Sequence, residues 1–274
     1  MKIMDWYEAF ENDEKKHQIC GKVKIIKNFP MPQLKRKRQI WIYLPKDYDI
    51  AMAKRYPVLY MNDGQNMFDP ATSCSGEWYV DETLDMYSKH GFHDGAIVVA
   101  VENSTLRQRE YMPGMEADKY AEFIIFSLKP FIDLNFRTLP FRETTGIGGS
   151  SMGGLISLYI GLKFQNVFGK IASFSPAMGI GWNEMTDFSR KYPMKIYNDV
   201  GTNEVHKSKR LSKKYADNVI AANRTLKKIG FPEAELKLVI EKDSTHHESA
   251  WAGRFGEAFV WLFDQQEINS YRNQ

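Results

Sequence analysis

The chain has 274 residues, of which 43% are hydrophobic and 26% are charged, and its formal net charge is +3. This composition can supply a large buried core and argues against intrinsic disorder. So small a net charge gives no reason to expect a nucleic acid partner. Two cysteines, Cys20 and Cys74, match no metal or redox spacing. No apolar signal segment or membrane-length run is present, so we expect a reduced, cytoplasmic protein with no membrane partner.

The first third of the chain begins with a predicted helix and two predicted strands. Residues 1–19 are acidic and carry two aromatic residues one helical turn apart, which predicts an amphipathic lead-in helix. Strands are expected over residues 21–29 and 36–45, and their succession favours an antiparallel pair. The basic run at residues 34–38 is expected to be a solvated hairpin edge rather than a nucleic acid site.

Short apolar runs then alternate with segments of helical periodicity. Strands are expected over residues 56–63, 95–102, 144–149, 169–176, 194–201 and 235–241. Helices are expected over residues 78–90, 117–135 (with a break near Pro130), 151–162, 211–229 and 251–262. This alternation predicts an α/β fold, with one domain over residues 1–274 and helices on both faces of a mostly parallel sheet. Functional residues are therefore expected where strands turn into helices.

One such turn holds the sequence GSSMG, residues 149–153. The pattern G-x-S-x-G between a strand and a helix is typical of a nucleophile elbow, in which small residues allow the two elements to approach closely. Ser151 would then lie near a helix N-terminus, whose free N–H groups stabilise negative charge. The alternative is a glycine-rich turn in which the serine only caps the helix. Ser150 is expected to be structural.

A nucleophilic serine needs a base and an acid that orients the base. His246 and His247 lie in a polar loop after the last predicted strand, and one of them is the candidate base. Glu204 follows the strand predicted at residues 194–201 and is the candidate acid. Three other carboxylates are weaker candidates: Asp199, Asp243 and Glu248. His206 is expected at the surface.

An oxyanion hole needs two N–H donors. Met152, directly after the candidate nucleophile, is expected to supply one of them. Gln65 is expected to supply the other, because Gly64 would let the backbone turn tightly after the strand at residues 56–63. The alternative is an ordinary Asp-Gly turn.

These pieces, in this order, resemble the putative-esterase family of α/β-hydrolases, and most closely its enterochelin-esterase-like branch. The resembling segments lie between residues 55 and 262 and include PVLYMNDGQNMFD, GEWYVDETLD, VFGKIASFSPA, DVGTNE and HHESAW. The resemblance implies an α/β-hydrolase fold with Ser151 as nucleophile. It implies His246 rather than His247 as the base, because the family's histidine lies five residues before a tryptophan, here Trp251.

The same resemblance implies Glu204 as the acid, although the family often has aspartate there. It also implies Gln65 and Met152 as the oxyanion donors. Four residues fall in loops that the family places around the substrate pocket: Trp78, Arg109, Glu110 and Tyr111. They are candidates to bind substrate, and the alternative is that they only brace these loops. Arg107 and Arg109 are candidates to pair with an anionic acyl or catecholate group.

The activity implied by the resemblance is that of a serine esterase that hydrolyses a carboxylic ester through a Ser-His-Glu triad and an acyl-enzyme, with no cofactor and no metal. The expected substrate is a small-molecule ester, either of an enterochelin-like siderophore or of an acylated sugar. One alternative is an acyltransferase that uses the same residues. Another is a non-catalytic binding protein that keeps this fold. Loss of a triad member would favour the binding protein, but all three candidates are present.

Overall fold

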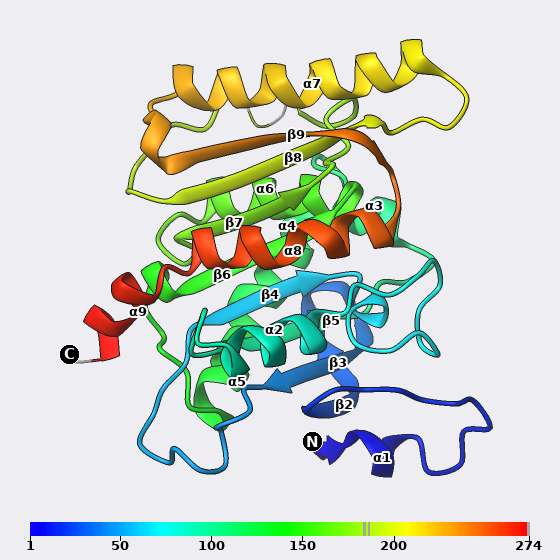
Figure 1. Ribbon diagram of the computed structural model, residues 1–274, viewed down its shortest axis with the longest axis vertical. Helices are drawn as coiled ribbons and strands as arrows, with labels where there is room; N and C mark the ends of the chain where they lie inside the picture. The colour runs from blue at the N-terminus through cyan, green and yellow to red at the C-terminus, as the bar shows by residue number, and fades with distance from the viewer. Residues whose placement is uncertain (183–184, 186, 273–274) are drawn as a thin grey trace.

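The computed structural model describes residues 1–182, 185 and 187–272 (Figure 1). Within these residues, nine strands form one sheet in the order β1-β2-β3-β5-β4-β6-β7-β8-β9. The strands are β1 (Met4–Asp5), β2 (Lys22–Met31), β3 (Arg36–Leu44), β4 (Val58–Asn62), β5 (Ile97–Val101), β6 (Thr145–Ser150), β7 (Lys170–Phe174), β8 (Lys195–Asn203) and β9 (Leu236–Thr245). Strands β4 through β9 are parallel, whereas β1, β2 and β3 pair antiparallel, as the sequence predicts for the two leading strands.

The helices are α1 (Trp6–Ala9), α2 (Val80–Lys89), α3 (Arg107–Tyr111), α4 (Ala117–Phe123), α5 (Lys129–Asn135), α6 (Met152–Lys163), α7 (Lys209–Lys228), α8 (Glu248–Leu262) and α9 (Gln265–Arg272). Short turns of helix are η1 (Pro32–Leu34), η2 (Gly64–Asn66), η3 (Ile124–Leu128), η4 (Arg142–Thr144) and η6 (Glu233–Glu235). The break predicted near Pro130 corresponds to η3, a π-helical turn between α4 and α5. Proline has no N–H to continue the regular bonding pattern, so the backbone widens before it.

Each face of the sheet carries its own apolar core. Helices α4, α5, α6 and α7 contribute to the core on one face, and α1, α2, α8 and α9 to the core on the other. Figure 1 shows α2 and α8 in front of the sheet and α6 behind it. Along β4, Val58 and Tyr60 face the first core, while Leu59 and Met61 face the second. The sheet is therefore covered on both faces, as predicted.

The N-terminal segment differs from the helix predicted for residues 1–19. It contains strand β1, paired with β2, and the single helical turn α1. The buried ring of Trp6 lies 4.9 Å from the ring of Phe10, and the His17 ring stacks on Phe10 at 4.2 Å. His17 Nδ1 is also 2.6 Å from Asp69 Oδ2. These tertiary contacts stabilise an irregular path, and isolated helices this short are marginal in water.

The basic run at residues 34–38 lies at the β2–β3 hairpin, where Lys35 and Lys37 are exposed as expected. Its two arginines differ from the expectation, because they pair with carboxylates of the chain. Arg38 is only 5% exposed and pairs with the fully buried carboxylate of Glu110. Arg36 Nη1 lies 2.6 Å from Glu110 Oε1 and 2.7 Å from Glu116 Oε2. The two arginines therefore attach α3 to β3.

Replacing Glu110 with glutamine is expected to lower the free energy of unfolding by about 3 kcal/mol, because two guanidinium groups would lose their buried partner. Urea unfolding of wild type and variant measures the difference. The matched control is Asp217→Asn, which breaks the exposed pair with Lys213 and should cost less than about 1 kcal/mol. Equal losses in the two variants would contradict a structural role for Glu110.

Candidate active site

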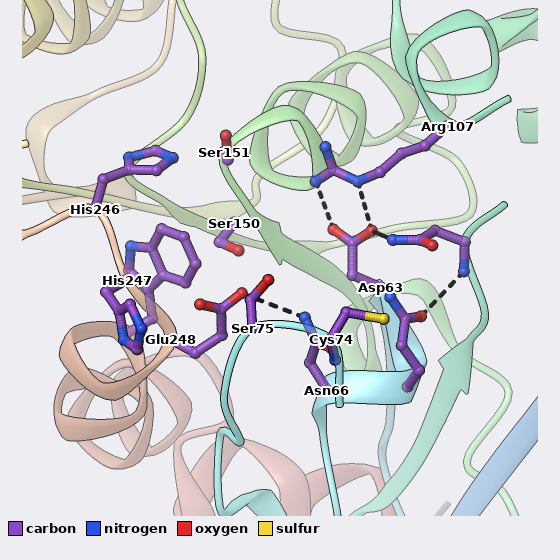
Figure 2. A pocket seen from close by; sticks show the side chains of 13 residues that line it. Asp63, Asn66, Cys74, Ser75, Arg107, Ser150, Ser151, His246, His247 and Glu248 are labelled. Carbon is purple, nitrogen blue, oxygen red and sulfur yellow. Dashed lines mark hydrogen bonds and ion pairs between the residues drawn. The ribbon is translucent and has the colours of Figure 1, made fainter. Parts of the chain in front are cut away.

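The residues selected from the sequence meet at the carboxyl edge of the parallel strands. Ser151 directly follows β6, Glu204 follows β8 and His246 follows β9. Gln65 lies in η2, the short helical turn that follows β4. Ser151, His246 and Gln65 line one cavity of about 470 Å³ (Figure 2). Parallel strands of one sheet thus gather segments that lie far apart in the sequence.

Ser151 occupies a sharp turn between β6 and α6. Its φ of 55° and ψ of −120° lie outside the regions that non-glycine residues favour. Its N–H donates to the Phe174 carbonyl at 2.9 Å, and its own carbonyl accepts from the Ala177 N–H at 3.0 Å. The neighbouring strand therefore holds the strained backbone in place. Ser150, by contrast, ends β6 and is almost fully buried, although it contributes to the cavity wall.

The two glycines of the motif, Gly149 and Gly153, lie so close to neighbouring atoms that a side chain at either position would clash. A Cβ atom on Gly149 would lie 2.9 Å from the Gly153 carbonyl carbon, and one on Gly153 would lie 2.9 Å from Asp63 Oδ2. Gly64 has a similar role, because a Cβ there would lie 2.6 Å from the Ala100 backbone. The tight turn predicted at Gly64 falls instead on Asp63, which has a φ of 59°.

His246 and Glu204 are in direct contact. His246 Nδ1 lies 2.5 Å from Glu204 Oε2, and its other ring nitrogen, Nε2, forms no hydrogen bond with the residues that the structure describes. Figure 2 shows the imidazole pointing toward the Ser151 hydroxyl. The Trp251 ring packs edge-on against the His246 ring at 4.9 Å, which restricts its orientation.

Ser175 is a residue that the sequence analysis missed. It follows β7, and its Oγ donates to Glu204 Oε1 at 2.6 Å while accepting from Trp251 Nε1 at 3.0 Å. The Gly201 N–H also donates to Glu204 Oε1, at 2.6 Å. Burial alone would raise the pKa of Glu204, but the hydrogen bonds from His246, Ser175 and Gly201 outweigh it and lower the pKa. Glu204 is thus held as a carboxylate.

The weaker acid candidates have other contacts. Asp199 is fully buried and pairs with Arg254 Nε at 2.7 Å. Asp243 is exposed, and Glu248 lines the cavity beside Asn66. His247 caps α8, where its Nδ1 accepts from the Ser249 N–H at 3.2 Å. His206 is exposed, as expected.

Both expected oxyanion donors occupy the first turn of a helix. Met152 is the first residue of α6, and Gln65 is the second of η2. N–H groups in a first turn have no partner within their own helix. Among the described residues neither N–H forms a backbone hydrogen bond outside its helix, so both groups stay candidate oxyanion donors.

None of the four residues expected to contact substrate lines this cavity, and Glu110 pairs with Arg38 instead. Trp78 is 1% exposed and packs against Phe174 and Trp251 in the core. Tyr111 is fully buried, where its hydroxyl accepts from the Asp63 N–H at 3.3 Å. Arg109 projects outward and lies 2.8 Å from Glu116. These residues belong to the core or to α3, not to open loops, and their side chains are not part of the cavity wall.

Arg107 is the residue of that segment that reaches the cavity. Its Nε and Nη2 bind the Asp63 carboxylate in a bidentate pair at 2.6 and 2.7 Å (Figure 2). Asn103 Nδ2 also donates to Asp63, at 2.6 Å. The arginine is therefore committed to a carboxylate of the chain itself and is not a free cation for an anionic substrate.

Glu248 adds a carboxyl group to the opposite wall of the cavity. Burial raises its pKa, and the charge of Asp63 adds to the effect. The remaining polar groups in the wall include Asn66, Ser75 and Asn103. The cavity is thus polar, with at least as much negative as positive charge.

The lowered pKa of Glu204 predicts a pH dependence of stability. A depressed carboxyl pKa contributes stability above the ordinary value of 4.5, and this contribution disappears as pH falls through the lower folded value. Wild type should exceed Glu204→Gln in free energy of unfolding by about 1–3 kcal/mol near pH 7. Urea titrations between about pH 7 and 3 should show the difference shrinking below pH 4.5. A constant difference would contradict an ionised Glu204.

No described helix is both long and apolar enough to cross a membrane.

Comparison with known proteins gives matches over most of the chain. The family model described as Putative esterase matches residues 32–262. Uncharacterized protein YbbA of Bacillus subtilis (strain 168) is 25% identical over 245 residues, which cover 82% of this chain and 92% of that protein.

Two solved structures are similar in fold. A ferulic acid esterase has a TM-score of 0.69 at 18% identity, covering 90% of this chain and 99% of that one. The enterochelin esterase from Shigella flexneri has a TM-score of 0.68 at 18% identity. That match covers 88% of this chain, which spans 58% of the Shigella protein. These similarities confirm the predicted α/β-hydrolase fold. The family match, which covers the whole candidate site, supports a hydrolase that acts on esters, and the chain belongs to the putative-esterase family.

Proposed function

We propose that this protein is a serine esterase that cleaves a carboxylic ester through an acyl-enzyme formed on Ser151. One observation carries the proposal. A serine in a strained elbow shares a cavity with a histidine whose Nδ1 is 2.5 Å from a buried carboxylate. This combination of nucleophile, base and orienting acid is the arrangement that activates a hydroxyl group. We further propose that residues 1–274 form a single domain, since one sheet includes strands from Met4 to Thr245.

In this mechanism His246 Nε2 accepts the proton of Ser151 as Oγ attacks the ester carbonyl. Glu204 holds the Nδ1–H tautomer and stabilises the imidazolium that forms. His246 then protonates the departing alcohol, which leaves the acyl group on Ser151. A water molecule, deprotonated by His246, releases the acid and restores the serine.

The tetrahedral intermediates carry negative charge on the former carbonyl oxygen. The Met152 and Gln65 N–H groups are the proposed donors to that oxygen. Because both belong to first turns of helices, they need no rearrangement to donate, and fixed donors of this kind contribute most where water is excluded.

The charge of the cavity favours a neutral ester over an anionic one. Among the described residues that line it, Arg107 is the one lysine or arginine, and it is already paired with Asp63. Glu248 adds a further carboxyl group. Of the two expected classes, a catecholate siderophore would bring negative charge into this wall. An acylated sugar would instead bring hydroxyl groups that can bond to amide and hydroxyl side chains. We therefore propose an acylated sugar or a similar polyhydroxylated ester.

Labelling with a fluorophosphonate, read by intact mass, tests the nucleophile. We expect one adduct on wild type and on Ser150→Ala, and none on Ser151→Ala. The neighbouring serine is a matched control, since it has the same chemistry one residue away. An adduct on Ser151→Ala would assign the nucleophile elsewhere, and an unlabelled wild type would favour the binding-protein alternative.

Steady-state kinetics test the base. His246→Ala should lower kcat by a factor of about 10³ or more. His247→Ala removes a helix cap and part of the cavity wall but not the contact with Glu204, so it should change kcat by less than about tenfold. Equal losses in the two variants would remove His246 from its proposed role. Products analysed with and without added alcohols separate hydrolysis from acyl transfer, which would use the same residues.

A matched pair of esters tests the charge of the cavity. Glu248→Gln should raise kcat/KM for the mono-p-nitrophenyl ester of succinate by about tenfold relative to p-nitrophenyl butyrate, since one negative charge is worth about 1–2 kcal/mol here. Because the pKa of Glu248 is raised, the effect should shrink as pH falls through that raised pKa and the carboxylate is protonated. The control is the exposed Glu257→Gln. An unchanged ratio in Glu248→Gln would contradict the electrostatic argument.

A further inference from the structure

A second group of carboxylates lies outside the cavity, where the chain enters α2. Glu77 precedes this helix, and Asp81 and Glu82 lie in its first turn. Each offers an oxygen atom, and these oxygens lie within 4.8 Å of one another. Glu77 is 5% exposed and Asp81 is fully buried, while Glu82 is partly exposed.

The carboxylates in this group lack the partners that buried charges normally have. Glu77 Oε1, Asp81 Oδ1 and Glu82 Oε2 are buried atoms with no hydrogen-bond partner in the described part of the chain. The other oxygen of Asp81 does have a donor, the Cys20 N–H at 2.7 Å. Among the described residues, no basic side chain forms a salt bridge with any of the three. Buried polar atoms are usually satisfied, so one orphaned oxygen on each of three neighbouring carboxylates indicates a missing cation or shared protons.

Helix α2 compensates only part of this charge. Asp81 and Glu82 lie at its N-terminus, where the helix dipole favours acidic residues. Glu77 lies outside the helix and gains less from it. Burial, and then the charge of Glu82, raise the pKa of Glu77 to about 8. Holding all three groups ionised without a counter-ion is therefore unfavourable.

We propose that Glu77, Asp81 and Glu82 bind one Ca²⁺ ion. An all-oxygen set of carboxylates suits a hard cation rather than zinc or copper, which prefer nitrogen and sulfur ligands. Two oxygens bound to the same Ca²⁺ at about 2.4 Å can lie up to about 4.8 Å apart. The three oxygens, which all lie within 4.8 Å of one another, satisfy this limit. Mg²⁺ fits less well, because it retains several waters and these buried side chains leave little room for them. The partly exposed Glu82 provides the route of entry.

Such an ion would brace one wall of the candidate active site. Glu77 follows Cys74 and Ser75, which line the cavity. Just beyond it, the Trp78 N–H donates to the Asn66 carbonyl at 2.9 Å and the Val80 N–H to that of Met67 at 3.1 Å. The proposed ligands therefore lie on the segment that supports η2, and cross-linking them would stabilise it. The ion has no part in the proposed ester chemistry, so the two proposals stand or fall separately.

Calorimetry and thermal unfolding of the full-length chain, stripped with EDTA, test the site. With CaCl₂ we expect one ion per chain and a melting temperature that rises with Ca²⁺ concentration. Glu77→Gln and Asp81→Asn should each lower the affinity at least about tenfold and remove most of the shift. MgCl₂ should bind at least about tenfold more weakly. The control Glu257→Gln, which changes an exposed glutamate on α8, should bind Ca²⁺ like wild type.

Two results would overturn the proposal. In the first, wild type shows no binding at millimolar Ca²⁺ and the neutral variants melt at higher temperature with or without the ion, which would mean that the carboxylates hold shared protons. Alternatively, Ca²⁺ could bind equally to wild type and both variants, which would locate the ion elsewhere. Should Asp81→Asn fail to fold, Glu77→Gln decides between these outcomes, because Glu77 accepts no backbone hydrogen bond comparable to that from Cys20.

Discussion

The buried carboxylate of Glu204 is the contact on which the arrangement of the candidate site depends. It accepts hydrogen bonds from Ser175 at the end of β7 and from Gly201 within β8, and it contacts His246 after β9. Three neighbouring strands are thereby joined at their carboxyl ends. Burial of a carboxylate is costly, and here the cost is offset only because its oxygens have donors on several sides. The position of the His246 imidazole is determined by its contact with Glu204 and by the ring of Trp251.

The same dependence explains which parts of the fold the sequence could predict. Buried strands such as β4 and β5 and the amphipathic helix α7 follow from local periodicity, and these predictions are confirmed. The order of strands and helices also places Ser151, Glu204 and His246 at one edge of the sheet. Their types and their positions after strands are local signals, so sequence reasoning can select them. Ser175 has no such signal, because a serine after a strand is common. Its role depends on its hydrogen bonds to Glu204 and Trp251, which the sequence does not reveal.

The incorrect expectations share a physical cause: each concerned a charged or aromatic side chain whose partner lies far away in the sequence. Arg38 was expected in solvent but is buried against Glu110, more than seventy residues later. The lead-in helix was expected from spacing alone, yet Trp6 belongs to the core that contains Trp41, and His17 contacts Asp69, more than fifty residues later. Trp78 was placed beside the substrate but lies in the core. Exposure and ion pairing are tertiary properties, and local patterns do not determine them.

These distant pairs also determine what the cavity can accept. Glu110 binds Arg36 and Arg38 and thereby fixes α3, the helix that begins with Arg107. Arg107 in turn neutralises Asp63, whose left-handed backbone begins the turn that carries Gln65. An ion-pair chain thus runs from β3 to the proposed oxyanion donor and uses every arginine along it. These arginines are paired with carboxylates of the chain itself. The ion pairs that order the cavity therefore also leave it without a free arginine for an anionic ester.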